Sequence, residues 1–177
     1  MLGPATFSIV ACDLQTGEFG VAVQSKFFAV GAAVPYARAG AGAAATQAWF
    51  DPAHGERALQ FLQAGVSSDE VIGALLDGDE GQAGRQLGVV DRQGRAAAYT
   101  GPKCQDWAGH VVGDGFCCQG NILAGSQVVA AMAEHFCAGS GPLPERMIGA
   151  LAAGQQAGGD RRGKQSAAIT VARPNSG

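Results

Sequence analysis

The N-terminal segment predicts a strand that is buried on both of its faces. In residues 6–12 (TFSIVAC), Phe, Ile and Ala alternate with Thr, Ser and Val, so neither face is polar enough to lie in water. A strand of this kind belongs in a sheet that is covered on both sides. Gly17 supplies the positive φ angle of a hairpin turn, and residues 19–25 return as the second strand. The chain therefore has to build a layer on each side of this hairpin.

The composition indicates a folded chain with neither a nucleic acid nor a membrane as partner. Its 177 residues suit one domain, and 47% of them are hydrophobic whereas only 15% are charged. The net charge is −3, and Lys and Arg form no cluster that would attract a nucleic acid or an anionic membrane. No apolar run has membrane-spanning length and no signal peptide opens the chain, so we expect a cytoplasmic protein.

The cysteine and histidine spacings argue against a disulfide framework and against a metal site. The five cysteines are an odd number and contain no C-x-x-C pair, which fits reduced, buried thiols. The three histidines lie far apart in sequence. We expect no metal and no other cofactor.

The remaining pattern predicts two sheets and two pairs of helices. Strands are expected at about 29–36 and 41–48, helices after Pro52 and Ser67, strand–turn–strand units with turns at Gln93-Gly94 and Asp114-Gly115, helices at about 126–138 and 144–157, and a last strand at 166–172. Each helix pair has one apolar stripe and so covers one sheet, which leaves the two sheets to face each other. This predicts an α+β fold, a four-layer αββα sandwich, in a single domain over residues 1–177.

Three stretches resemble a known bacterial family. The chain is similar to the domain-of-unknown-function family 1028 over residues 6 to about 172. The first similar stretch is the N-terminal hairpin together with the segment that follows it, and the other two are "QGNILAG" and "GGDRRGKQSAAI". That family is assigned to the N-terminal-nucleophile (Ntn) hydrolase superfamily. The resemblance implies the αββα fold and a catalytic site at the start of the first strand. Family members generally begin close to the threonine and continue past the last strand, whereas here five residues precede Thr6 and the sequence ends at Gly177.

The resemblance makes Thr6 the candidate nucleophile. In an Ntn hydrolase the hydroxyl or thiol of the first mature residue attacks the substrate, and the α-amine of the same residue takes the proton. A base of this kind needs a pKa near neutrality. The pKa of an α-amine is about 7.7–8.0, whereas that of a lysine is about 10.4. Thr6 fits this role if Met1–Ala5 are removed. The alternative is that Thr6 is a strand residue favoured by its β-branch. Ser8 lies on the same face and is a candidate substrate neighbour.

Two charged residues are further catalytic candidates. "VQSK" resembles the Val-Asp-Ser-Arg stretch of proteasome-type enzymes, but Gln24 stands where those enzymes use an acidic residue. Lys26 can lower the pKa of the nucleophile by its charge, or it is a solvated lysine at a strand end. By superfamily analogy Asp160 is placed to hold the amine or hydroxyl of Thr6, or it belongs to a solvated, self-neutralising loop.

Seven residues are candidate substrate contacts. Gly120 and Asn121 can donate to an oxyanion, or form a turn with Asn as a helix cap. The cation cluster of which Arg161 is part suits a substrate carboxylate. The full set is Ser8, Ser25, Gln47, Gly120, Asn121, Arg161 and Ser166.

The sequence leaves several functions open. The first is an Ntn amidohydrolase that acts on a small, acidic amide or peptide-like substrate. The second is a non-catalytic Ntn-fold binding or assembly protein, in which the N-terminal residues are retained. A third is a cysteine hydrolase that uses Cys104 or Cys118 with His110. Exposed apolar groups such as Trp49 and Phe50, and a sheet edge left open after the last strand, favour a homodimer.

Overall fold

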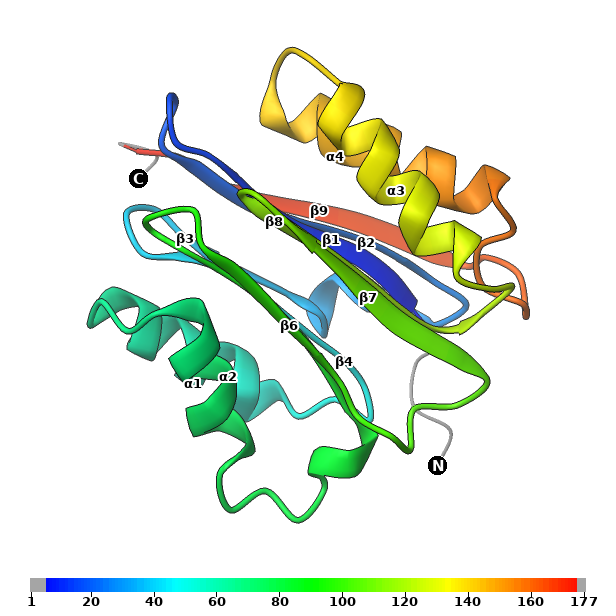
Figure 1. Cartoon of the computed structure of the whole chain (residues 1–177), viewed down its shortest axis with the longest axis horizontal. Coiled ribbons are helices and arrows are strands. Elements are labelled where there is room, and N and C mark those ends of the chain that lie inside the picture. The colour runs from blue at the N-terminus through cyan, green and yellow to red at the C-terminus, as the bar shows by residue number, and fades with distance from the viewer. Residues whose placement is uncertain (1–5, 175–177) are drawn as a thin grey trace.

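The structure, a computed structural model, describes residues 6–174 and contains two antiparallel sheets and four helices (Figure 1). The expected α+β class is therefore confirmed. One helix pair lies on the outer side of each sheet, and the two sheets face each other across the middle of the molecule (Figure 1).

The larger sheet has the N-terminal hairpin at its centre. Its five strands are, in spatial order, β7 (Trp107–Gly113), β8 (Phe116–Leu123), β1 (Thr6–Asp13), β2 (Glu18–Ser25) and β9 (Ser166–Ala172). The hairpin register pairs Thr6 with Ser25, and Gly17 has a φ of 72°, as the turn requires. The first strand thus pairs with β2, its neighbour in sequence, and with β8, from the other half of the chain.

The smaller sheet is built from one continuous stretch of the chain. Its strands follow sequence order and are β3 (Pro35–Arg38), β4 (Gly42–Ala48), β5 (Arg85–Asp91) and β6 (Ala96–Thr100). Two short 3-10 helices, η1 (Val30–Ala32) and η2 (Gln82–Gly84), precede β3 and β5. Ala and Gly make up most of β4, which allows neighbouring layers to approach its backbone closely.

The four helices begin at signals that are visible in the sequence. They are α1 (Pro52–Gln63), α2 (Ser68–Leu76), α3 (Gln127–Ala138) and α4 (Leu143–Gln156). Asp51 caps α1 by accepting a hydrogen bond from the N–H of Ala53 at 2.9 Å, and Pro52 occupies the first helical position. Ser67 and Glu70 form the capping box that opens α2.

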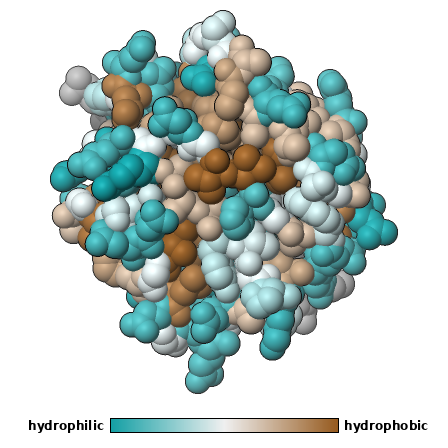
Figure 2. Space-filling model, viewed as in Figure 1, coloured by the Kyte–Doolittle hydropathy of each residue, from teal (hydrophilic) through white to brown (hydrophobic). Residues whose placement is uncertain are grey.

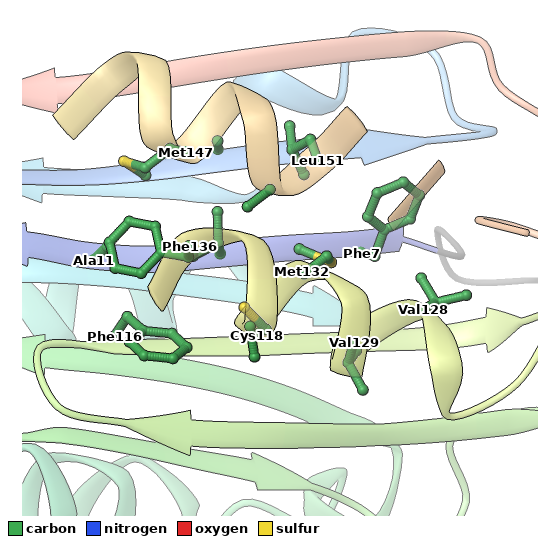
Figure 3. Close-up of a cluster of buried hydrophobic side chains, with 14 of the residues drawn as sticks. Phe7, Ala11, Phe116, Cys118, Val128, Val129, Met132, Phe136, Met147 and Leu151 are labelled. Carbon is green, nitrogen blue, oxygen red and sulfur yellow. The ribbon is translucent and has the colours of Figure 1, made fainter. Parts of the chain in front are cut away.

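Helices α3 and α4 cover the larger sheet through an apolar core (Figure 3). The outer face of β1 supplies Phe7, Ile9 and Ala11, which are fully buried. The rings of Phe116 and Phe136 lie 4.9 Å apart between their centroids and join β8 to α3. The alternation in β1 thus separates a helix-facing row from a row that faces the other sheet. Helices α1 and α2 cover the smaller sheet in the same way, through a second cluster of buried residues.

The predicted strand at 29–36 was wrong in its first half. Ala29 has a φ of 53°, residues 30–32 form η1, and the strand begins only at Pro35. The reason is topological, since the chain leaves the larger sheet after β2 and enters the smaller sheet at β3. A hydrogen bond from the N–H of Val30 to Ser166 Oγ, at 3.0 Å, fixes this crossing, and Gly31 lies so close to β9 that a Cβ atom would meet Ala168 at 2.5 Å.

A hydrogen bond between two turns joins the two sheets at the end of the molecule opposite the start of β1. The N–H of Cys12 donates to the carbonyl of Gly115 at 2.9 Å, and the N–H of Gly115 donates to the carbonyl of Gly94 at 3.1 Å. Because Gly94 belongs to the smaller sheet's hairpin, this end of the inter-sheet space is closed by backbone pairing.

The surface seen in Figure 2 is mixed, with polar side chains around the rim and apolar side chains gathered near the middle. None of the helices within residues 6–174 is both long enough and apolar enough to cross a membrane.

The inter-sheet packing gives a first prediction. Gly88 in β5 faces Gln119, and a Cβ atom at Gly88 would lie 2.4 Å from Gln119 Oε1. Gly88→Ala should lower the free energy of unfolding by about 1–3 kcal/mol, because the Gln119 side chain is fully buried and held by Ser8. Denaturant unfolding measures this change.

The matched control is Gly73→Ala on the exposed side of α2, where nothing lies within 4 Å of the added Cβ. This variant should raise the free energy of unfolding by about 0.5–1 kcal/mol, because alanine loses less entropy in a helix. Equal effects of the two substitutions would contradict the close packing at Gly88.

Candidate functional site

One end of the inter-sheet space is lined by polar side chains, whereas the rest is apolar. The apolar part includes Val10, Val21 and Val90. Because β1 and β5 begin where β2, β4 and β8 end, residues that are distant in sequence meet at the polar end. The side chains there are at most 2% exposed, and they belong to Thr6, Ser8, Ser25, Gln47, Gln86, Gln119 and Asn121.

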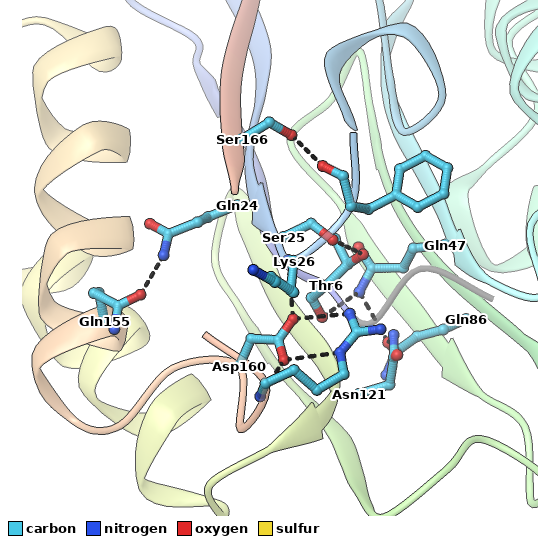
Figure 4. A network of polar contacts seen from close by, with 12 residues as sticks. Thr6, Gln24, Ser25, Lys26, Gln47, Gln86, Asn121, Gln155, Asp160 and Ser166 are labelled. Atoms are coloured by element: carbon cyan, nitrogen blue, oxygen red, sulfur yellow. Dashed lines mark hydrogen bonds and ion pairs between the residues drawn. The ribbon is translucent and has the colours of Figure 1, made fainter. Parts of the chain in front are cut away.

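Thr6 is the first residue of β1 and is fully buried. Its hydroxyl donates to Ser25 Oγ at 3.2 Å, and Thr6 and Ser25 are the last pair of residues in the β1–β2 ladder. Its main-chain carbonyl accepts a hydrogen bond from Gln47 Nε2 at 3.3 Å. Thr6 is thus held by its own sheet through its side chain and by the facing sheet through its backbone (Figure 4).

Gln47 is the centre of a chain of hydrogen bonds between the sheets. Its Oε1 accepts from the Ser8 hydroxyl at 2.7 Å, and Ser8 Oγ in turn accepts from Gln119 Nε2 at 2.7 Å. Its Nε2 also donates to Gln86 Oε1 at 2.8 Å. All polar atoms of this amide therefore have protein partners.

Gln86 extends the chain into β8 and β6. Its Nε2 lies 2.8 Å from the carbonyl of Gly120 and 3.0 Å from Thr100 Oγ1, while its Oε1 also accepts from Asn121 Nδ2 at 2.9 Å. Gly120 leaves no room for a side chain, because a Cβ atom would meet Leu123 at 2.4 Å. Asn121 lies within β8 and well before α3, so the helix-cap alternative for Asn121 is wrong.

Asp160 is buried beside this end of β2. One of its carboxylate oxygens accepts from the main-chain N–H of Lys26 at 3.0 Å and also pairs with Arg162 Nη2 at 3.0 Å. The other oxygen accepts from the N–H of Arg162 at 2.9 Å. Asp160 binds Lys26, and Ser25, the residue before Lys26, binds Thr6, so the two site residues are connected through the end of β2 (Figure 4). A direct contact between Asp160 and Thr6 stays a prediction.

The other candidates have structural contacts of their own. Lys26 has an exposed side chain, and only its backbone binds Asp160. Arg161 is exposed and its Nη1 lies 3.5 Å from Asp106 Oδ2. Ser166 donates to the carbonyl of Phe27 at 2.6 Å and so anchors the segment after β2.

The resemblance of VQSK to a stretch of proteasome-type enzymes draws attention to Gln24 in β2. Its side chain donates to Gln155 Oε1 in α4, on the face of the sheet away from Thr6 (Figure 4). Gln24 therefore has no contact through which it could orient a lysine toward Thr6.

Strained backbone gathers at the polar end. Within residues 6–174, four residues other than glycine have φ between 52° and 64°, namely Ala29, Ala48, Asp106 and Ile122. They follow β2, end β4, precede β7 and lie near the end of β8, which places all four at the end where β1 begins. A left-handed β-branched residue such as Ile122 is a rare conformation, and such strain is found most often at functional sites.

A partly buried ionic cluster supports the smaller sheet at this end. Arg85 Nε lies 2.8 Å from Asp79 Oδ2 and its guanidinium also donates to the carbonyl of Trp49. The hydrogen bond from Arg85 lowers the pKa of Asp79 to about 2. His54 is buried, its Nε2 lies 3.6 Å from Asp79, and burial lowers its pKa. The cluster fixes the backbone that follows Gln47.

The structure does not support the cysteine-hydrolase alternative. Burial raises the pKa of Cys104 and raises that of Cys118 well above 9, so both thiols stay protonated. Cys118 belongs to the core under α3, whereas His110 pairs in register with Gln119 and so lies on the inter-sheet face. His110 Nδ1 lies 2.9 Å from Thr100 Oγ1.

No group of three or more His, Cys, Asp or Glu side chains in the described part of the chain is arranged to hold a metal ion. The polar end itself is lined by hydroxyl and amide groups, which are weak metal ligands without carboxylate support.

Sequence reasoning missed Gln86 and Gln119 as members of this site. Both interrupt otherwise apolar strands, "RQLGVV" and "FCCQGN", on the row that faces the other sheet. A glutamine in such a row has to find a buried partner, which is the signal that could have identified them.

The fold and the buried threonine define an α+β protein whose polar end lies between two antiparallel sheets. Residues 6–177 match the model of a family of unknown function, DUF1028, and the chain belongs to this family. The crystal structure of protein SPO2555 from Silicibacter pomeroyi, which carries the same family designation, is similar to this chain with 36% sequence identity and a TM-score of 0.91. The match covers 97% of this chain and 74% of that chain. No curated protein matches.

The His54 site gives a second prediction. Because the pKa of His54 is lower in the folded protein than its ordinary value of 6.5, the unfolded chain binds a proton at this residue first as the pH falls. The free energy of unfolding should therefore decrease as the pH drops below about 6.5. Denaturant unfolding between pH 7.5 and pH 5 measures the slope.

His54→Gln should show a smaller slope, and His135→Gln on the exposed side of α3 serves as the control. The charges that act on His54 are Arg85 and Arg57, which lower its pKa, and Asp51 and Asp79, which raise it. An unchanged slope in His54→Gln would show that the lowered pKa of buried His54 does not cause the pH dependence of the free energy of unfolding.

Proposed function

We propose that this protein is an Ntn-type amidohydrolase with a four-layer αββα fold and Thr6 as its nucleophile. The observation that carries the proposal is the position of Thr6, which begins the central strand at the polar end and whose hydroxyl is hydrogen-bonded to Ser25. The neutral polar chain around it and the left-handed backbone at the same end add support.

The reaction follows from the chemistry of an N-terminal threonine. The freed α-amine takes the hydroxyl proton while Oγ1 attacks the carbonyl carbon of an amide. The C–N bond then breaks, the proton passes to the leaving amine, and an acyl ester remains on Thr6. Water activated by the same amine hydrolyses the ester, and this restores the hydroxyl. Asn121, whose amide has a second N–H, is the proposed oxyanion donor.

This mechanism requires removal of Met1–Ala5, which lie outside the described residues. While the Ala5–Thr6 bond is intact, the Thr6 nitrogen is a peptide nitrogen and cannot accept a proton. Cleavage by the protein itself or by a protease would supply the base.

A small, acidic amide is the proposed substrate. Asp160 forms an ion pair with Arg162, and Asp106 forms one with Arg161. These two cations are therefore less available to bind a substrate carboxylate than the sequence indicated. Lys26 and Lys164 are exposed, and no ion pair of either is found among the described residues. Their charges would attract a carboxylate near the site.

A non-catalytic binding or assembly protein is the second candidate. The observation that favours it is the burial of Thr6, which is 0% exposed and whose hydroxyl is therefore closed to a substrate in this structure. A cytoplasmic location and a homodimer also stay predictions. Trp49 is 47% exposed and available for contact, whereas Phe50 packs edge-to-face on Phe27.

The third prediction tests the nucleophile. Intact-mass measurement should show that the purified wild type begins at Thr6, and it should release p-nitroaniline from glutamyl- and aspartyl-p-nitroanilide faster than from leucyl-p-nitroanilide. Thr6→Ala should lose the activity by at least about 100-fold, since the nucleophile is removed, while Thr6→Ser should keep a measurable part.

Ser68→Ala is the control for loss of a buried hydroxyl elsewhere, at the start of α2. An active wild type that retains Met1–Ala5, or unchanged activity of Thr6→Ala, would end the proposal. An unprocessed and inactive wild type would favour the non-catalytic candidate.

A further inference from the structure

The amide chain at the polar end has only one possible orientation. Gln86 Nε2 faces three oxygen atoms, those of Thr100 Oγ1 and the carbonyls of Gly109 and Gly120, so this atom has to be the nitrogen. Its Oε1 must then accept, and it does so from Gln47 Nε2. The identity of each amide atom is fixed by its neighbours rather than by a free choice of rotamer.

The same logic orients Gln47 toward Thr6. Its Nε2 faces two acceptors, Gln86 Oε1 at 2.8 Å and the Thr6 carbonyl at 3.3 Å. Its Oε1 receives the Ser8 hydroxyl, which is itself the acceptor of Gln119 Nε2. The hydrogen bonds therefore run in one direction, from Gln119 through Ser8 and Gln47 to Gln86.

Gln47, in the smaller sheet, binds the backbone of Thr6. The side-chain bond of Thr6 to Ser25 stays within the larger sheet, so it cannot set the distance between the sheets. Gln47 comes from the end of β4, next to Ala48, whose φ is 64°. It joins the proposed nucleophile to that constrained backbone.

We propose that Gln47 is a positioning residue that fixes the main chain of Thr6 relative to the smaller sheet, with Gln86 as the residue that orients Gln47. This inference rests on the proposed function for its kinetic consequence, but not for its structural consequence. The carbonyl carbon whose oxygen Gln47 binds is bonded to the Thr6 Cα, and this Cα carries the amine nitrogen and the Cβ that bears the hydroxyl. A shift of this carbonyl therefore moves the base and the nucleophile together.

The fourth prediction uses substitutions of similar shape. Gln47→Glu replaces the donor by an oxygen that faces two acceptors, and Gln47→Met removes both polar functions at similar length. Each should lower kcat about 10- to 100-fold and change KM less than about two-fold, because the geometry of attack is disturbed while the substrate contacts remain. Gln156→Glu and Gln156→Met on the exposed side of α4 are the matched controls.

The pH profile separates positioning from a loss of structure. Protonation of the new carboxyl group in Gln47→Glu restores one donor, so kcat of this variant relative to wild type should recover as the pH falls, whereas Gln47→Met should show no such recovery. Gln86→Glu should behave like Gln47→Glu, since it also replaces a donor by an oxygen that faces acceptors, here the carbonyls of Gly109 and Gly120. Parallel pH profiles of Gln47→Glu and Gln47→Met would overturn the proposal.

Crystal structures of the wild type and of Gln47→Met provide a readout without catalysis. The Thr6 carbonyl should move by about 1 Å relative to β4 in the variant. If it stays in place, or if kcat of both Gln47 variants equals that of wild type, the positioning role is refuted and the proposed function stands. If no anilide is hydrolysed by the wild type, the proposed function fails, and the position of Thr6 in the two crystal structures alone decides the inference.

Discussion

Hydrogen bonds between buried amide groups at one end of the inter-sheet space shape the rest of the structure, although Gln119 Oε1 has no hydrogen-bond partner among the described residues. A buried amide without partners costs about 1–3 kcal/mol, so a cluster of such groups is stable only if each one has a partner. Gln47 and Gln86 provide these partners by bonding to each other and to the backbone of both sheets. The sheets can therefore meet in one register only, since a slip would leave several amides unpaired.

Close packing explains why two glycines lie in the strands of the polar end. Gly88 makes room for Gln119 between the sheets, whereas Gly120 makes room on the helix-facing side for Leu123 of its own strand and for Phe7 of β1. Glycine at these positions has a packing role, because neither has the positive φ that would require it. At the opposite end a backbone hydrogen bond from Gly115 to Gly94 joins the two sheets.

Much of the fold follows from local sequence signals. The apolar alternation of β1, the turn at Gly17 and the capping box of α2 were each visible as patterns and are present in the structure. The segment around Ala29 is predicted to be a strand but forms η1, because the chain changes sheets there and no local pattern shows this change. Contacts of the site depend on pairing between distant strands, so the place of Gln86 in an apolar strand could be read from the sequence, whereas its partners could not.

The strand order also has a consequence for how the chain matures during translation. The smaller sheet uses one stretch of residues and can form as soon as that stretch leaves the ribosome. The N-terminal hairpin has to wait for β8 and β9, and the contact of Ser8 with Gln119 spans 111 positions. Long-range pairing of this kind is slow, and unpaired strand edges are prone to aggregate. The polar end is therefore assembled last, by a hairpin that is synthesised before the strands with which it pairs.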